Sequence, residues 1–147
     1  MIEKPVLTAA EAAAKVRPGD VLHLGGFLGC GNPDPLVAAL VATGIDNLTL
    51  VCNDSGIYNE AKGIDNGPAP LVRAHAFSRI IVSHIGTNPE TQRQMNAGET
   101  DVQLVPQGTL AERIRAAGNG LGGVLTPTGV GREVEQGKHK VTQHGQD

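Results

Sequence analysis

The sequence predicts an α/β fold: an open, mainly parallel sheet with helices on both faces, built by a single domain over residues 1–147. Three observations lead to this prediction. Four short apolar runs of strand length recur along the chain. Capping and glycine signals for helices stand between the runs. Glycine or polar residues follow each run, as they do where parallel sheets bind ligands. A chain of 147 residues is long enough to bury one core.

The first predicted helix begins at a capping box. Thr8 and Glu11 have the spacing at which each side chain satisfies a backbone N–H of the other. Pro18-Gly19 ends the helix, and the first strand is predicted over Val21–Leu24. Three small apolar residues are expected to form the core face of the helix: Ala12, Ala13 and Val16.

The stretch from Gly25 to Pro33 joins this strand to a second helix, predicted from about Pro35 to Thr43. Its glycines let the backbone take positive φ angles and approach a ligand closely. Asp34 is expected to cap the helix, and such a helix N-terminus is a usual place for an anionic ligand. Neither common phosphate motif fits, because Asp34 replaces the third glycine of G-x-G-x-x-G and no Gly-Lys-Ser/Thr is present. On spacing alone, a turn that serves only packing stays an equal alternative.

Composition excludes several classes of function. The net charge is −3 without a basic cluster, and only three aromatic residues are present, so nucleic acid is not an expected partner. No apolar run approaches the roughly 18 residues of a membrane span, and no signal-peptide pattern opens the chain. Cys30 and Cys52 form no disulfide pattern, which favours a reducing cytoplasm. The histidines lack metal-ligand spacing, so no metal is predicted.

Polar residues follow the second and third predicted strands, Leu48–Cys52 and Arg79–Ser83. Asn53 and Asp54 come directly after the second strand, and their spacing alone indicates an Asx turn. His84 follows the third strand. A histidine at that place could act as a base, but a histidine without a partner is more often structural.

The connections around the third strand differ in clarity. Residues 56–76 have no clear period, and their glycines and prolines predict a long surface loop with a short helix near Leu71–His75. After the strand, Asn88 is expected to cap a helix that begins at Pro89 and ends near Ala97.

The last clear elements are a strand over Asp101–Val105 and a helix after it. Pro106-Gln107-Gly108 is the polar exit of the strand. Thr109 and Glu112 have the spacing of a second capping box, so the helix is expected to run to about Ala117. Three residues of this helix are expected to face the core: Leu110, Ile114 and Ala117.

Three segments together form a recognisable pattern. Gly25-Gly26-Phe27 is followed at fixed spacing by Gly31 and Pro33. The second segment, residues 104–115, reads Leu-Val-Pro-Gln-Gly-Thr-Leu-Ala-Glu-Arg-Ile-Arg, and the third is residues 125–131. In this order the three blocks resemble the first (alpha) subunit of the class I coenzyme A transferases, over nearly the whole chain.

The resemblance implies a half-site in this chain. The family transfers coenzyme A between an acyl-CoA and a free carboxylate, with the CoA thioester as substrate and no further cofactor. A glutamate in a Ser-Glu-Asn-Gly segment of the second (beta) subunit forms a glutamyl-CoA thioester, and the present sequence has no such segment. The resemblance therefore implies a cytoplasmic α2β2 heterotetramer without a catalytic residue in this chain. The residues that it implies for the acyl and CoA site are Gly25, Gly26, Phe27, Gly31, Asn53, Gln107 and Gly108.

Some features depart from the family pattern. Ala117 and Asn119 interrupt its usual Ala-Gly-Gly-Ala-Gly, and Arg132 replaces a common Thr. Residues 138–147 predict an interrupted surface hairpin, after which family alpha subunits continue for roughly half as much chain again. The fold is therefore expected to be incomplete at its C-terminus, whether the stop is natural, proteolytic or engineered. Residues 83–91 most resemble the short-chain enzymes that act on acetate, butyrate and acetoacetate.

Two other functions stay open from the sequence. A non-catalytic subunit that binds CoA or stabilises a partner would need the glycine segment but no partner glutamate. A related α/β isomerase or hydrolase would need its own acid or base, for which His84 is the candidate.

Overall fold

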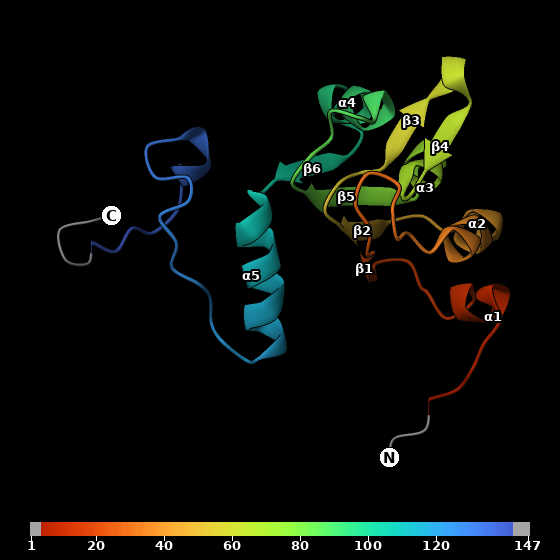
Figure 1. The fold of residues 1–147 in the computed structure, drawn as a ribbon, viewed down its shortest axis with the longest axis horizontal. Coiled ribbons are helices and arrows are strands. Elements are labelled where there is room, and N and C mark those ends of the chain that lie inside the picture. Colours follow the sequence, from red (N-terminus) through yellow and green to blue (C-terminus); the bar gives the residue numbers. More distant parts are fainter. Residues whose placement is uncertain (1–3, 143–147) are drawn as a thin grey trace. The chain divides into compact units, whose positions relative to one another are not determined.

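The computed structural model describes residues 4–142, and these form two compact units (Figure 1). Unit 1 comprises Met1–Leu104 and unit 2 comprises Val105–Asp147. In the described part of the chain, no helix is long and apolar enough to cross a membrane.

Unit 1 is built on a four-stranded parallel sheet. Its strands are β1 (Val21–His23), β2 (Leu48–Val51), β5 (Phe77–Val82) and β6 (Asp101–Leu104), in the order β1-β2-β5-β6. One row of the register aligns four apolar residues across the whole sheet: Leu22, Leu50, Ile80 and Val102. The predicted fold class, an open parallel α/β sheet, is confirmed.

The core of unit 1 lies between one face of the sheet and a layer of helices. The layer contains α2 (Asp34–Thr43), α3 (Ala69–Arg73) and α4 (Pro89–Asn96), which contact one another in that order, and α1 (Ala9–Ala13) packs against α2. Leu50 and Ile80 are fully buried beneath this layer, together with Leu40 of α2 and Leu71 of α3. The opposite face of the sheet is more polar. It carries the exposed His23 and the ion pair of Arg79 with Asp101.

Of the three helix caps predicted in unit 1, two are confirmed and one is wrong. Thr8 and Glu11 form both hydrogen bonds of the capping box. Asn88 caps α4, because its side-chain oxygen accepts hydrogen bonds from the N–H groups of Glu90 and Thr91. Asp34, in contrast, does not cap α2, since the helix already includes it and Pro33 stands at the cap without a side-chain hydrogen bond.

The segment predicted as a long loop contains regular structure. β3 (Ile57–Asn59) and β4 (Ile64–Asn66) form an antiparallel hairpin around the 3-10 turn η1 (Glu60–Lys62). The side chain of Asn59 accepts a hydrogen bond from the N–H of Lys62, and Gly63 closes the turn with a φ angle of 62°. The hairpin packs beside α3 (Figure 1), which begins at Ala69 rather than near Leu71.

Unit 2 contains the helix α5 (Gln107–Gly118), the short 3-10 turn η2 (Glu133–Glu135) and irregular chain. The capping box predicted at Thr109 is wrong, because α5 begins two residues earlier and Pro106 is its cap. Of the predicted inward residues, Leu110 is buried, whereas Ile114 is 44% exposed and Ala116 is buried in place of Ala117. The hairpin predicted over residues 138–147 lies partly outside the described residues, and residues 138–142 form no strand.

Candidate functional site

The glycine segment forms a tight reverse turn between β1 and α2. Phe27 and Cys30 exchange backbone hydrogen bonds, in which each N–H donates to the other carbonyl at 2.9 Å. The residues between them, Leu28 and Gly29, have φ angles of 46° and 81°. Positive φ at both central residues characterises the type I′ turn, and leucine rarely adopts it. Contacts from outside the turn therefore have to stabilise this backbone.

The predicted residues of this turn differ in exposure. Gly25 and Gly31 are exposed and Gly26 is half-buried. Phe27 is 60% exposed, although burial of a large aromatic ring contributes strongly to the stability of a core or an interface. The turn thus offers open backbone and one apolar ring to a ligand or a partner chain.

The contact that stabilises the turn comes from Asp54, at the carboxyl end of β2. This residue is only 2% exposed, and its carboxylate accepts three hydrogen bonds. Oδ2 accepts from the N–H of Leu28 at 2.9 Å and from Nδ2 of Asn53 at 3.1 Å. Oδ1 accepts from the N–H of Gly56 at 2.9 Å, which confirms the predicted Asx turn. One carboxylate therefore joins the glycine turn to the end of the second strand.

Asn53 is held between two strands. Its carbonyl accepts hydrogen bonds from the N–H of Ser83 at 2.9 Å and from the hydroxyl of Ser83 at 2.7 Å. Its amide nitrogen donates to Asp54, as described above. The half-buried Asn53 thus lies beside the glycine turn, because both it and Leu28 donate to the same oxygen. The structure brings these two parts of the predicted site together.

The loops after β2 and β5 are tied to each other by buried polar groups. Asn88 is fully buried, and its Nδ2 donates to the carbonyl of Ser55 at 2.7 Å. The hydroxyl of Thr87 donates to the carbonyl of Gly56 at 2.9 Å. The sequence predicted the helix-capping role of Asn88, but it did not predict the bond from Asn88 to Ser55 or the bonds from Leu28 and Asn53 to Asp54. The one signal for these contacts in the sequence is the run of polar residues after the second strand.

His84 forms a backbone bridge with Asp54, but its imidazole is exposed. Among the described residues, no side chain is placed to hydrogen-bond and orient that ring. A general base needs such an orienting partner, so the structure gives His84 no support as a base.

Gln107 and Gly108 lie in unit 2, in the first turn of α5, and both are exposed. They follow the end of β6 closely, as predicted, but they belong to α5 itself and not to a segment before it. Their predicted role at the acyl site stays a prediction.

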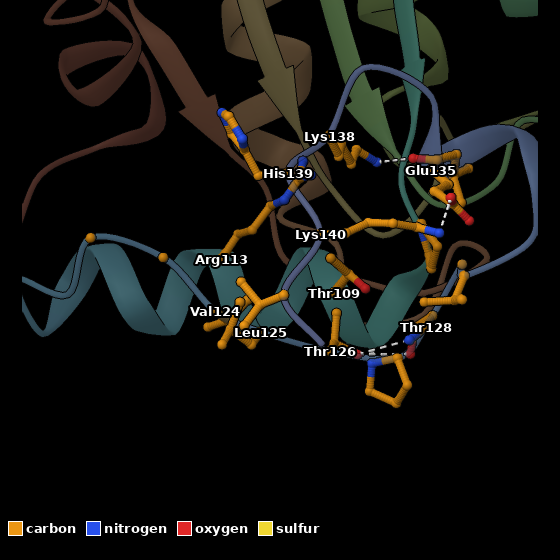
Figure 2. A pocket seen from close by; sticks show the side chains of 18 residues that line it. Thr109, Arg113, Val124, Leu125, Thr126, Thr128, Glu135, Lys138, His139 and Lys140 are labelled. Atoms are coloured by element: carbon orange, nitrogen blue, oxygen red, sulfur yellow. Dashed lines mark hydrogen bonds and ion pairs between the residues drawn. The ribbon is translucent and has the colours of Figure 1, made fainter. Parts of the chain in front are cut away.

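Unit 2 also contains an open cavity of about 670 Å³ (Figure 2). Its wall combines apolar residues such as Val124 and Leu125 with threonine hydroxyls, and Arg113 and His139 lie along it. Lys140 pairs with Glu135 at 2.5 Å, and Thr126 and Thr128 hydrogen-bond to each other at 3.0 Å. None of the predicted site residues lines this cavity.

The titratable groups with shifted pKa values are structural. Burial raises the pKa of the Cys52 thiol, which keeps it protonated and a poor nucleophile. Hydrogen bonds from Arg93 lower the pKa of Glu90 to about 2, on the surface of α4. Within residues 4–142, no three His, Cys, Asp or Glu side chains gather closely enough to hold a metal ion.

Comparison with known proteins assigns the family. The model of the coenzyme A transferase family matches residues 6–146. The chain belongs to the coenzyme A transferase family. It is 49% identical over 140 residues to the acetate CoA-transferase subunit alpha of Escherichia coli K12, which covers 95% of this chain and 61% of that protein. It is 43% identical to the acetoacetyl-CoA:acetate/butyrate CoA transferase alpha subunit of Clostridium acetobutylicum, over 88% of this chain and 56% of that subunit.

Solved structures agree on the fold. The acyl-CoA transferase YdiF of E. coli O157:H7, in a thioester complex with CoA, superposes with a TM-score of 0.73 at 23% identity, over 86% of this chain and 25% of that one. A variant of the decarboxylase AibA/AibB superposes with a TM-score of 0.74 at 22% identity, over 94% of this chain and 53% of that one. Since a decarboxylase shares this fold, the fold alone does not define the reaction.

Proposed function

We propose that this chain supplies the alpha-subunit half of a CoA-transferase site that moves coenzyme A between a short-chain acyl-CoA and a free carboxylic acid. The observation that supports it is the fixed amide of Asn53 beside the exposed glycine turn. Backbone and amide N–H groups held in place can stabilise the negative oxygen that forms when a thioester is attacked. The chain spans 51% to 61% of the lengths of three of its curated relatives, so the activity of the whole enzyme is part of the proposal.

The proposed reaction is a thioester exchange in two halves. A partner glutamate attacks the thioester carbonyl, the C–S bond breaks, and CoA leaves as a thiolate, which gives an acyl-glutamyl anhydride. The thiolate then attacks the glutamyl carbonyl and displaces the acyl group as a carboxylate, which leaves glutamyl-CoA. The acceptor acid reverses both steps. In this scheme Asn53, the glycine turn and Gln107 bind the substrate, while the nucleophile comes from a beta subunit with a Ser-Glu-Asn-Gly segment.

The names of the relatives support small acids as substrates. One relative is named for acetate, and another for acetoacetyl-CoA, acetate and butyrate. A mycobacterial relative at 44% identity is named as part of a probable succinyl-CoA:3-ketoacid coenzyme A transferase. We therefore propose acetyl-, butyryl- or acetoacetyl-CoA as donors. Because the first relatives are named as alpha subunits, the expected partner is a beta subunit, in an α2β2 assembly.

CoA exchange between acetoacetyl-CoA and acetate tests the proposal, with this chain alone and with a co-expressed beta subunit. Activity only in the pair supports the half-site. Borohydride, which reduces a glutamyl-CoA thioester to an alcohol, should then inactivate the donor-treated pair and change the mass of a beta-subunit peptide only. Reduction of a glutamate in this chain would contradict the assignment of the nucleophile.

The alternative is a non-catalytic subunit that binds CoA or stabilises its partner. The absence of a Ser-Glu-Asn-Gly segment from this sequence fits both functions, because the proposed transferase takes its glutamate from the beta subunit. CoA binding by the chain together with an inactive complex, in which the beta subunit is bound at equal stoichiometry, would establish the alternative.

A further inference from the structure

Asp54 is a buried carboxylate whose hydrogen bonds divide between two tasks. The Oδ1 bond to Gly56 closes a local turn of three residues. The Oδ2 bonds reach Leu28, 26 positions away in the glycine turn, and the amide of Asn53. Within residues 4–142, no ion pair neutralises this carboxylate, so neutral N–H groups alone stabilise its charge. Hydrogen bonds to a charged group are roughly twice as strong as neutral ones.

The Oδ2 atom sets the relative position of two groups in the proposed site. Leu28 has a φ angle of 46°, which leucine adopts only under constraint, and its N–H is directed at Asp54. The side-chain Nδ2 of Asn53 donates to the same oxygen, so the side-chain amide is fixed with its Oδ1 directed away from Asp54. The hydroxyl of Ser83 lies 3.4 Å from this Oδ1. A shift of this carboxylate would therefore move the glycine turn and the Asn53 amide together.

We propose that Asp54 is a positioning residue for acyl transfer, which acts through Leu28 and Asn53 and does not touch the substrate. The inference rests on the proposed function. Through Oδ2, Asp54 holds the glycine turn and the Asn53 amide at the spacing that the thioester oxygen requires. Catalysis by placed donors is sensitive to small displacements, because the donors must match the transition state rather than the ground state.

Asp54→Asn leaves one acceptor oxygen for the two tasks. The variant has the same shape, but its NH2 group cannot accept a hydrogen bond. Whichever way the amide turns, this group faces either Gly56 or the pair Leu28 and Asn53 as donors that it cannot satisfy. Asp46→Asn is the matched control, because the same change is made on an exposed carboxylate outside the site.

Amide hydrogen exchange by NMR on the chain alone gives the first readout, which is independent of activity. In the wild type, the Leu28 amide should exchange at least about 10-fold more slowly than the Gly29 amide, for which the described residues offer no acceptor. Asp54→Asn should lower the protection at Leu28 or at Gly56, because one amide oxygen cannot replace both carboxylate oxygens. Equal wild-type rates at Leu28 and Gly29 would overturn the proposal, and this comparison needs no variant that folds.

Kinetics of the complex with the beta subunit give the second readout. Asp54→Asn should lower kcat by roughly 10- to 100-fold and change KM for the acyl-CoA less than about 3-fold. In a double-mutant cycle, Asp54→Asn combined with Asn53→Ala should lose less activity than the product of the two single effects, since Asp54 acts in part through Asn53. Full additivity, or an unchanged kcat despite a released Leu28 amide, would overturn the inference. Inactivity of the wild-type complex would count against the proposed function alone, because the exchange readout does not depend on it.

Discussion

The side chain of Asn32 lies directly against Gly26, so closely that a Cβ atom at position 26 would be 2.0 Å from Oδ1 of Asn32. The same asparagine also packs against Gly67, at the end of the β3–β4 hairpin, and its Nδ2 is buried without a hydrogen-bond partner among the described residues. The glycine turn is thus confined from the side of the hairpin as well as by Asp54.

Gly26→Ala should therefore destabilise the chain by about 1–3 kcal/mol, because the methyl group meets Asn32 and the φ angle of 126° strains any L-residue. The measurement is urea unfolding followed by circular dichroism. Gly25→Ala is the matched control, since its φ is not positive and a Cβ there meets nothing within 4 Å. Adding Asn32→Ala to Gly26→Ala should recover only the part caused by the clash. Equal stability of the two alanine variants would contradict this explanation.

Gln94 is a fully buried polar residue of α4 whose loss should be costly. Its Nε2 donates to the carbonyl of Val72 and to Glu90, each at 2.8 Å, and its Oε1 accepts from the hydroxyl of Thr100 at 2.9 Å. Gln94→Leu removes all three of these bonds, although the carbonyl of Val72 still accepts from the N–H of His75 and the hydroxyl of Thr100 can still donate to the carbonyl of Phe77. We therefore expect a loss of about 2–3 kcal/mol in unfolding free energy from the lost bonds and the polar groups left under-satisfied. Gln92→Leu, which breaks one half-buried bond to the carbonyl of Ile85, should cost about 1 kcal/mol. A larger loss of unfolding free energy in Gln92→Leu than in Gln94→Leu would show that the buried network of Gln94 is not what stabilises this region.

The sequence predicted the sheet because its strands are signalled locally. Leu48–Cys52 is a near-continuous apolar run typical of a buried parallel strand, and the cap at Asn88 follows from side-chain chemistry within three residues. The β3–β4 hairpin was missed, since strands of three residues show too little alternation to be recognised. The cap at Thr109 was wrong because the N–H of Leu110 bonds to the carbonyl of Pro106, which starts α5 at Gln107.

The candidate site was predictable only in its residue types. The glycine segment and Asn53 were recognised by resemblance, and the structure brings them together. The hydrogen bond from Leu28 to Asp54 joins positions 26 residues apart, and no local period in the sequence predicts such a contact. The predicted Asx turn accounts for the bond that Oδ1 of Asp54 accepts from Gly56, but not for the bonds that Oδ2 accepts.

Stability should fall in acid partly through Glu90. Hydrogen bonds from Arg93, which also pairs with Glu99, lower the pKa of Glu90 to about 2. An unfolded glutamate titrates at about 4.3, so the folded state binds fewer protons and loses this stabilisation as the pH falls from about 5 toward 2. Arg93→Gln should return the pKa of Glu90 toward its ordinary value, measured by NMR of the side-chain carboxyl. It should also flatten the dependence of unfolding free energy on pH over that window.

The control for this experiment is Arg115→Gln. Arg115 pairs with Glu112 on the exposed surface of α5, so its loss should leave the titration of Glu90 unchanged. An unaltered pKa of Glu90 in Arg93→Gln would assign the shift to another neighbour, such as the amide of Gln94 at 2.8 Å.

Asn53→Ala and Gln107→Ala test the two amides that the family resemblance implies for the acyl site. If an amide stabilises the thioester oxygen, its loss should lower kcat/KM of the complex with the beta subunit by roughly 100-fold, as the loss of one oxyanion donor does in other acyl transfers. Gln136→Ala is the control, since this exposed glutamine follows η2 and belongs to no predicted site. Because Gln107 and Asn53 belong to different units, a strong effect at Asn53 with none at Gln107 would restrict the site to unit 1. It would also leave the exposed first turn of α5 available for another role, such as contact with the partner.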